Sequence, residues 1–195
     1  MSNDRILQIA NELLRLGTEL KVLVGEVIPP PVEDIQFQYS PSFPALNMTV
    51  QRVPNARFKL AYFFTTYNGS WDASGSIWAT PKWAKDKFLR NSSHPDFFDD
   101  AGGQNHLYGM VLDPNGSPKR DVSFRFKWPD GYTDHAVKLR SGWANEPIYS
   151  SFDPSRGESG VWSWWPLSST ADIIAGGGLP LNHHVSSFAV WQEVA

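Results

Sequence analysis

The sequence predicts a mainly β protein: an N-terminal α-helix that forms a coiled coil, then an antiparallel β-sandwich head with one short helix. Aromatic residues make up 14% of the 195 residues, and 15 Gly and 15 Pro supply many turns, a composition typical of short strands. Apolar side chains in residues 6–23 follow a heptad spacing. From residue 106 onward, β-type segments alternate with turn signals.

The N-terminal helix is expected over residues 3–24, within an oligomerisation segment that comprises residues 1–24. Ser2 or Asn3 can cap this helix, and Asp4 lies in the first turn, where the helix dipole favours negative charge. The apolar side chains are spaced 3, 4, 3, 4 and 3 residues apart, which is a heptad seam made of Ile6, Ile9, Leu13, Leu16, Leu20 and Leu23.

This seam has two interpretations. An amphipathic helix could lie on the head, or the helices of several protomers could form a short parallel coiled coil. The heptad period and the stiff segment that follows favour the coiled coil, and Ile at the first two positions favours a trimer over a dimer. About three heptads are marginal alone, and Gly17 costs roughly 1 kcal/mol relative to Ala. The head would therefore have to help hold the oligomer.

Residues 25–34, GEVIPPPVED, form a Pro-rich spacer. Pro29, Pro30 and Pro31 impose polyproline geometry and cannot continue a helix. The spacer is expected to separate the oligomerising stem from the head.

The head comprises residues 35–195, with a first part at 35–105 and a second at 106–195. In the first part, alternation predicts a strand for Ile35, Phe37 and Tyr39, and one shared strand face for Phe58, Leu60, Tyr62 and Phe64. Thr80 and Pro81 are expected as the N-cap and N1 residues of a short helix. Its inward side chains would be Trp83, Phe88 and Leu89.

In the second part, strands are expected in HLYGMVLD, DVSFRFKW, TDHAVKLR, GVWSWWPL and HHVSSFAVWQEV. The turn signals PNGSP and PDGY and the segment SGWANEP lie between some of these strands. Turn signals at this spacing predict an antiparallel β-sandwich or barrel.

The strand–turn–strand LYGMVLDPNGSPKRDVSFRF carries Gly109, Asp113, Asn115-Gly116 and Pro118. On these residues, the stretch from about His106 to Glu193 resembles a small carboxypeptidase-regulatory or transthyretin-like β-sandwich, in which this hairpin opens the sandwich. The ending, SFDPSRGESGVWSWWP followed by ADIIAGGGLPLNHHVSSFAVWQ, is similar to β-modules appended to bacterial and phage cell-wall or surface proteins. The resemblance covers about half of the chain and implies a non-catalytic accessory module.

The composition excludes several functional classes. Lys plus Arg number 17 and Asp plus Glu 20, a net charge of −3 without a basic block, so we expect no nucleic-acid partner. The absence of Cys excludes disulfides, thiolate zinc sites and a cysteine nucleophile. MSNDRILQIANELL lacks the pattern of a secretory signal, and no apolar run reaches about 18 residues, so we expect synthesis in the cytoplasm without a signal peptide and no membrane insertion.

Catalytic motifs do not stand out, and no catalytic residue, cofactor or metal is expected. Residues 157–160, GESG, do not form a nucleophile elbow. Residues 176–178, GGG, lack the Lys of a phosphate loop and suggest instead a loop with positive φ or close backbone approach. A metal site remains an open alternative at His94, Asp96, Asp99 or Asp100. A glycosidase would need two carboxylates across a cleft, and no spacing distinguishes Asp130, Asp134, Glu146 and Glu158.

Aromatic side chains are the strongest functional lead. In VWSWWP, Trp162 and Trp164 share one strand face and Trp165 points to the other. Exposed aromatic rings suit stacking on sugars or burial at protein interfaces. The alternative is that most of the nine Trp fill the core, although a domain this size rarely buries so many fully. Trp128, Tyr132 and Trp143 lie beside turn signals, where we expect side chains to be accessible. The candidate ligand or interface aromatics are Trp128, Tyr132, Trp143, Trp162, Trp164 and Trp165.

These observations predict a non-enzymatic structural or binding protein on the surface of a virion or similar particle. The layout of stem, spacer and aromatic head is similar to phage fibre, receptor-binding and capsid-decoration proteins. Expected partners are further copies of this chain, with a trimer favoured, and other particle proteins or surface glycans. The alternative is a carbohydrate-binding accessory module of a cell-wall-acting system, and a third hypothesis is a small hydrolase.

Overall fold

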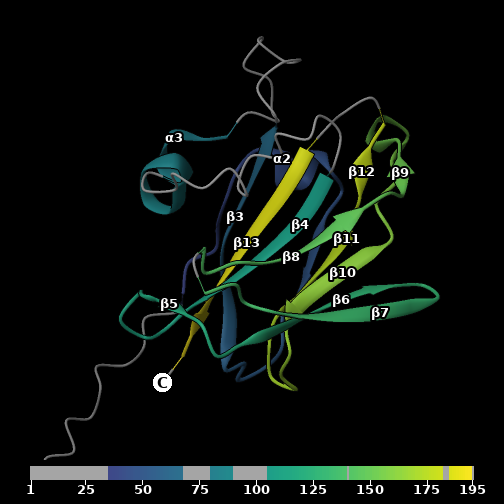
Figure 1. The fold of residues 1–195 in the computed structure, drawn as a ribbon. Coiled ribbons are helices and arrows are strands. Elements are labelled where there is room, and N and C mark those ends of the chain that lie inside the picture. The colour runs from purple at the N-terminus through teal and green to yellow at the C-terminus, as the bar shows by residue number, and fades with distance from the viewer. Residues whose placement is uncertain (1–34, 68–79, 90–104, 140, 182–184, 195) are drawn as a thin grey trace, which may run out of the picture. The chain divides into compact units, whose positions relative to one another are not determined.

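The structure, a computed structural model, describes residues 35–67, 80–89, 105–139, 141–181 and 185–194 (Figure 1). Contacts divide the chain into Met1–Asp34 and Ile35–Ala195, and all that follows concerns the second unit. The predicted coiled-coil helix, the Pro-rich spacer and the alternative metal residues at positions 94–100 lie outside the described residues.

The second unit is mainly β, as predicted. Its early elements are β1 (Gln38–Tyr39), α2 (Ser42–Ala45), β2 (Thr49–Gln51), β3 (Phe58–Tyr67), α3 (Lys82–Ala84) and the π-helix η1 (Lys85–Leu89). The middle of the chain forms β4 (Asn105–Leu112), β5 (Pro118–Lys119), β6 (Ser123–Trp128), β7 (Gly131–Ala136), β8 (Ala144–Ile148) and β9 (Ser151–Phe152). The remaining elements are the 3-10 helix η3 (Pro154–Arg156), β10 (Trp162–Pro166), β11 (Ile173–Gly177), β12 (Leu179–Pro180) and β13 (Val185–Glu193).

Two large sheets face each other in a sandwich-like arrangement (Figure 1). The six-stranded sheet has the order β1-β3-β13-β4-β5, with β8 also paired to β4, and the five-stranded sheet has the order β2-β11-β10-β6-β7. Their inner faces share one apolar cluster, which includes Leu60 and Val111 from the first sheet and Phe124 and Ile174 from the second. Strands from residues 35–105 and from 106–195 pair within both sheets, so the two predicted parts of the head form one body.

Buried indole groups hydrogen-bond between the layers. The Nε1 group of Trp164, in β10, donates to the carbonyl oxygen of Tyr108 in β4 at 3.2 Å. The Nε1 group of Trp191, in β13, donates to the carbonyl oxygen of Asp172, just before β11, at 2.8 Å. Because a buried N–H without a partner costs free energy, these bonds let two large Trp side chains fill the core.

The prediction of an antiparallel sandwich is wrong for the six-stranded sheet. β13 runs parallel to β4, from Ser187 opposite Leu107 to Gln192 opposite Leu112. Turn signals specify antiparallel pairing only between strands adjacent in the chain, and β13 is far from β4 in sequence. Its residues 185–191 are all buried, which is typical of a strand covered on both faces.

A β-bulge changes the face of the sheet to which the side chains of β3 point. One shared face was predicted for Phe58, Leu60, Tyr62 and Phe64. The register between β3 and β13 shifts at Ala61, because Val190 lies opposite Tyr62 and Trp191 lies opposite Leu60. The first two side chains therefore lie in the core between the sheets, and the last two pack on the opposite face. The predicted shared face is wrong for this reason.

The opposite face of the six-stranded sheet is also covered. The rings of Tyr108 and Phe188 stack with centroids 4.3 Å apart, and those of Phe188 and Phe64 with centroids 4.9 Å apart, across three neighbouring strands. Trp83 and Phe88, from α3 and η1, pack on this cluster as predicted. The predicted cap differs: the N-cap residue of α3 is Pro81, and it makes no side-chain hydrogen bond.

The glycine run at residues 176–178 begins within β11 rather than in a loop. Gly176 has a φ of +89°, as the prediction of positive φ requires. A Cβ atom on Gly177 would lie 2.7 Å from Cζ3 of Trp164. The expected close approach is therefore present, and it lets the Trp164 ring approach the backbone of the next strand.

A buried carboxylate, which the sequence did not single out, joins β2, β3 and β11. Asp172 is 1% exposed. Its side chain accepts hydrogen bonds from the backbone N–H groups of Leu60 at 2.9 Å and Val53 at 3.0 Å, and from Nη1 of Arg52 at 2.5 Å. These hydrogen bonds satisfy the buried carboxyl group, which would otherwise be costly to place in the interior.

Candidate binding face

Three of the six predicted ligand or interface aromatics are buried. Trp164 is 0% exposed and Trp162 is 7% exposed, and both belong to the core between the sheets. Trp143 was expected to be accessible because it follows a turn signal, and it is 1% exposed. Its ring packs edge-on against Phe188, with centroids 5.1 Å apart, because the β7–β8 connection folds over the six-stranded sheet.

The other three aromatics are associated with the five-stranded sheet. Trp165 is only half-buried, since burial alternates along β10 as the sequence predicted, although it still packs against the core cluster. Tyr132, on β7, is 58% exposed. Trp128 ends β6 and rests on Trp162, with centroids 4.9 Å apart, at one end of the sandwich.

Strand register defines the outer face of the five-stranded sheet, which we call the binding face. Lys127 of β6 lies opposite Ser163 of β10 and opposite Tyr132 of β7. Arg125, two residues before Lys127 in β6, lies opposite Trp165 of β10 and opposite Asp134 of β7. Residues two apart share a face of a strand, so aromatic, cationic and hydroxyl side chains stand side by side on a rigid surface.

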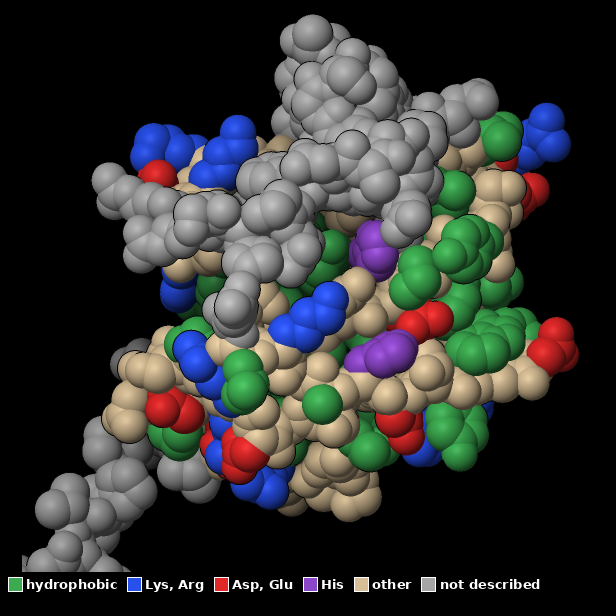
Figure 2. Space-filling model, in the orientation of Figure 1, with side chains coloured by type: hydrophobic (Ala, Val, Ile, Leu, Met, Phe, Trp, Pro, Cys, Tyr) green, Lys and Arg blue, Asp and Glu red, His purple; other side chains and the backbone are tan. Residues whose placement is uncertain are grey.

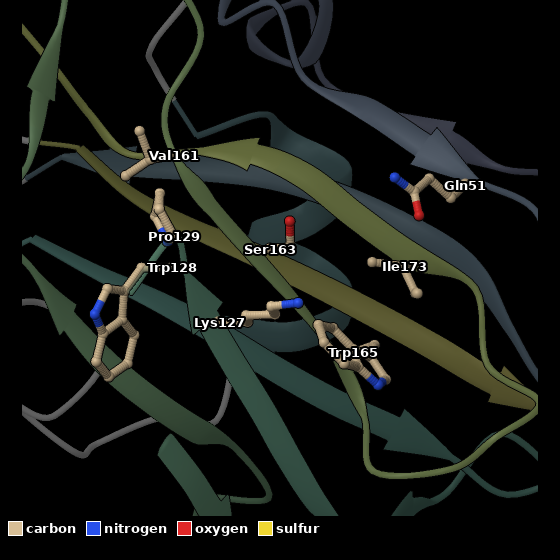
Figure 3. Close-up of a pocket in the computed structure, with 8 residues that line it drawn as sticks. All are labelled: Gln51, Lys127, Trp128, Pro129, Val161, Ser163, Trp165 and Ile173. Carbon is tan, nitrogen blue, oxygen red and sulfur yellow. The ribbon is translucent and has the colours of Figure 1, made fainter. Parts of the chain in front are cut away.

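A hollow of about 280 Å³ lies on this face and extends to its rim (Figure 3). Its floor combines the half-buried ring of Trp165 with polar side chains, and Figure 3 shows the Lys127 side chain directed toward that ring, with Ser163 beside it. The hollow is lined by Gln51, Lys127, Trp128, Pro129, Val161, Ser163, Trp165 and Ile173.

Charge on the binding face is only partly neutralised. Nε of Arg125 donates to Oδ1 of Asp134 at 2.8 Å, and Nη2 donates to Oδ2 at 2.8 Å. The hydrogen bond from Arg125 lowers the pKa of the Asp134 carboxyl below its usual range. The Arg125 guanidinium also lies 4.0 Å from the Tyr132 ring centroid. Arg125 is thus engaged on both sides, whereas Lys127 pairs with no carboxylate among the described residues.

A histidine–glutamate pair lies away from this face. In Figure 2 a histidine side chain meets an acidic one between β7 and β8, and Nε2 of His135 lies 2.5 Å from Oε2 of Glu146. Thr133 Oγ1 lies 3.5 Å from the same nitrogen. A nucleophile–base–acid relay uses the two different ring nitrogens, so this arrangement is better suited to bridging the two sheets than to catalysis.

The other carboxylates considered for glycosidase chemistry serve local roles. Asp134 binds Arg125, as above, and Glu158 accepts a hydrogen bond from the backbone N–H of Asp153 at 2.7 Å. Asp130 is exposed in the β6–β7 turn. In the part of the chain that the structure describes, no group of three or more His, Asp or Glu side chains is placed to hold a metal ion.

Within the same described ranges, no helix combines the length and the apolar character that crossing a bilayer requires. Comparisons of the chain with family models, with curated proteins and with solved structures find no match.

Proposed function

We propose that this protein is a non-catalytic binding protein of a virion or similar particle surface, and that its head binds saccharides on the binding face. The observation that carries the proposal is the hollow in which the ring of Trp165 and the apolar side chain of Ile173 share the lining with the polar side chains of Gln51, Lys127 and Ser163. An indole ring offers a flat apolar surface to the C–H groups of a sugar ring, and adjacent polar groups can hydrogen-bond to its hydroxyls.

The rigidity of the sheet supports this function. Trp165, Ser163 and Lys127 are held by strands β10 and β6, which pair with each other along the hollow. A preorganised surface orders few side chains when it binds, so less of the contact free energy is lost.

The dimensions of the hollow favour an extended ligand. Small-molecule pockets enclose about 300–1,000 Å³, and this hollow measures about 280 Å³. A saccharide chain could place one ring on Trp165 and continue along the binding face toward Tyr132, which is 58% exposed. Such a site suits a polymer better than a small metabolite.

The particle-surface setting comes from the sequence. A trimeric stem through Leu13, Leu16 and the other heptad positions would present several heads at once, and linked heads multiply a weak affinity. The resemblance of residues 106–193 to transthyretin-like accessory modules supports the same non-catalytic role. A cell-wall-acting system that carries this head is the alternative setting.

The saccharide proposal can be tested by affinity electrophoresis of the full chain against a panel of polysaccharides: β-glucan, mannan, polygalacturonate, carboxyl-reduced polygalacturonate, alginate and a glycosylated teichoic acid. We expect retardation by at least one polymer and a loss of about tenfold in affinity for Trp165→Ala, since loss of one stacking contact costs about 1.4 kcal/mol. Tyr149→Ala is the matched control, because Tyr149 is 76% exposed and does not line the hollow.

Retardation that Trp165→Ala leaves unchanged would place the site elsewhere. Absence of retardation on every polymer would overturn the proposal. Near-UV circular dichroism of Trp165→Ala separates loss of the site from loss of the fold.

The oligomer is tested by light scattering on the full chain. We expect a trimer that dissociates when Leu13→Asp and Leu16→Asp are combined, because two charges in each seam cannot be buried. A double variant that keeps the parent mass would show that these residues do not form the seam.

A further inference from the structure

We propose that the saccharide is anionic and that Lys127 contacts its carboxylate or phosphate group. This inference rests on the proposed function, since it names the class of ligand for the same hollow. Its basis is a cation, Lys127, that has no counterion among the described residues, whereas the neighbouring Arg125 has one.

The contrast between neighbouring basic residues is the first observation. Arg125 makes a two-pronged pair with Asp134, and elsewhere Arg57 and Lys119 share Glu193 at 2.6 and 3.2 Å. Lys127 lies in the same row of β6 as Arg125. No carboxylate lines the hollow, and none among the described residues pairs with Lys127.

The position of Lys127 is the second observation. It stands between Tyr132 and Ser163 on the paired strands, and its side chain lines the hollow together with Trp165. Lys127 is exposed, so its ammonium group is free to meet a ligand, and a charge-assisted hydrogen bond to an anion is stronger than one between neutral groups. A sugar ring stacked on Trp165 would therefore bring a ring substituent within reach of the ammonium group.

Other donors can complete the recognition of an anion. The hydroxyl of Ser163 and the side-chain amide of Gln51 both line the hollow, and each can donate to an oxygen. The whole chain carries a net charge of −3, so it does not attract acidic polymers in general. Attraction of such a polymer must come from a local cation, and Lys127 supplies it.

The test uses the same polysaccharide panel with Lys127→Met, which keeps most of the aliphatic stem and removes the charge. We expect an acidic polymer to be bound by the native chain, with about tenfold weaker binding after Lys127→Met, as for loss of one charged hydrogen bond. Raising the salt concentration should weaken binding of the native chain more than that of the variant. Lys138→Met is the control, because Lys138 is exposed after β7 and does not line the hollow.

The panel distinguishes a uronate ligand from a phosphate ligand. It also distinguishes failure of this inference from failure of the proposed function. Retardation by polygalacturonate or alginate identifies a uronate, and retardation by teichoic acid alone identifies a phosphate. The inference is overturned if the carboxyl-reduced polymer or another neutral polymer binds as well as any acidic one. It is also overturned if Lys127→Met leaves the affinity for acidic polymers unchanged. In both cases Trp165→Ala still tests the proposed function. If no polymer binds, both are overturned.

Discussion

The two large sheets differ in what covers their outer faces. On the six-stranded sheet, outward residues such as Tyr108, Met110 and Phe188 are apolar and are covered by α3, η1 and the β7–β8 connection. On the five-stranded sheet, the outward residues Arg125 and Lys127 are charged. The two sheets differ in which residues occupy the outward positions of their strands. β propensity does not account for this difference, because both sheets place aromatic residues at their inward positions.

This contrast teaches where an aromatic residue has functional meaning. Phe188 and Trp143 lie among other rings, and their burial accounts for their presence. Trp165 is half-buried and packs on the core, and on the outer face it lines a hollow with apolar side chains such as Ile173 and with the polar Lys127 and Ser163. A partly exposed Trp ring that lines a surface hollow is the less expected observation, and it is the one on which the proposed binding role rests.

The largest effect is expected at the covered face. Phe188→Ala removes the middle ring of the stack between Tyr108 and Phe64, and should lower the free energy of unfolding by about 3–5 kcal/mol. Urea unfolding followed by circular dichroism measures this change. Tyr132→Ala is the control on the open face and should change stability far less. Similar losses for both variants would remove the distinction between the two faces.

The next largest effect concerns Asp172, which joins elements of both sheets. Asp172→Ala leaves the N–H groups of Leu60 and Val53 without their acceptor, and should destabilise the fold by about 3 kcal/mol. Asp172→Asn keeps one carbonyl oxygen and should cost less. Chemical unfolding of the two variants in parallel checks this order. If Asp172→Ala and the native chain had the same free energy of unfolding, these hydrogen bonds would make no net contribution to stability.

Trp165→Ala should have a smaller effect on stability than on binding. The ring is half-buried on the outer face, so we expect a loss of about 1–2 kcal/mol in unfolding free energy, below the value for a core aromatic. Thermal unfolding with and without the bound polysaccharide measures both properties in one experiment. A loss as large as that of Phe188→Ala would identify Trp165 as a core residue.

The smallest effect is the pH dependence from Asp134. Its pKa is lowered in the folded state, chiefly by the hydrogen bond from Arg125, so its contribution is present above the ordinary Asp pKa of about 3.9 and is lost as the pH falls through the lowered value. Asp134→Asn should therefore flatten the acid limb of a plot of Tm against pH. An unchanged slope for Asp134→Asn would show that the pair is screened by solvent.

Much of the fold could be predicted because strands and turns depend on local patterns. The alternation in VWSWWP correctly separated Trp162 and Trp164 from Trp165. The bulge at Ala61 and the parallel pairing of β13 with β4 could not be predicted, because both depend on a partner strand far away in sequence. Trp143 was misplaced because a turn signal says nothing about which surface the following residue meets.

The candidate site was predictable only in part. Trp165, Trp128 and Tyr132 were named from the sequence because aromatic residues are visible in it. Lys127 was missed, since a lysine in a strand resembles any solvent-exposed lysine until the register sets it beside Ser163. Asp172 was missed for a similar reason, because its donors come from residues more than a hundred positions away.

The place of β13 has a consequence for biosynthesis. This strand, residues 185–193, lies between β3 and β4 and hydrogen-bonds to both. Until residues 185–193 have emerged from the ribosome, the edges of β3 and β4 that pair with β13 have no partner, and such edges can recruit other chains. The six-stranded sheet therefore assembles late and slowly, as folds dominated by distant contacts do. A nascent chain that stops short of β13 would be a substrate for chaperones and proteases rather than a partly functional head.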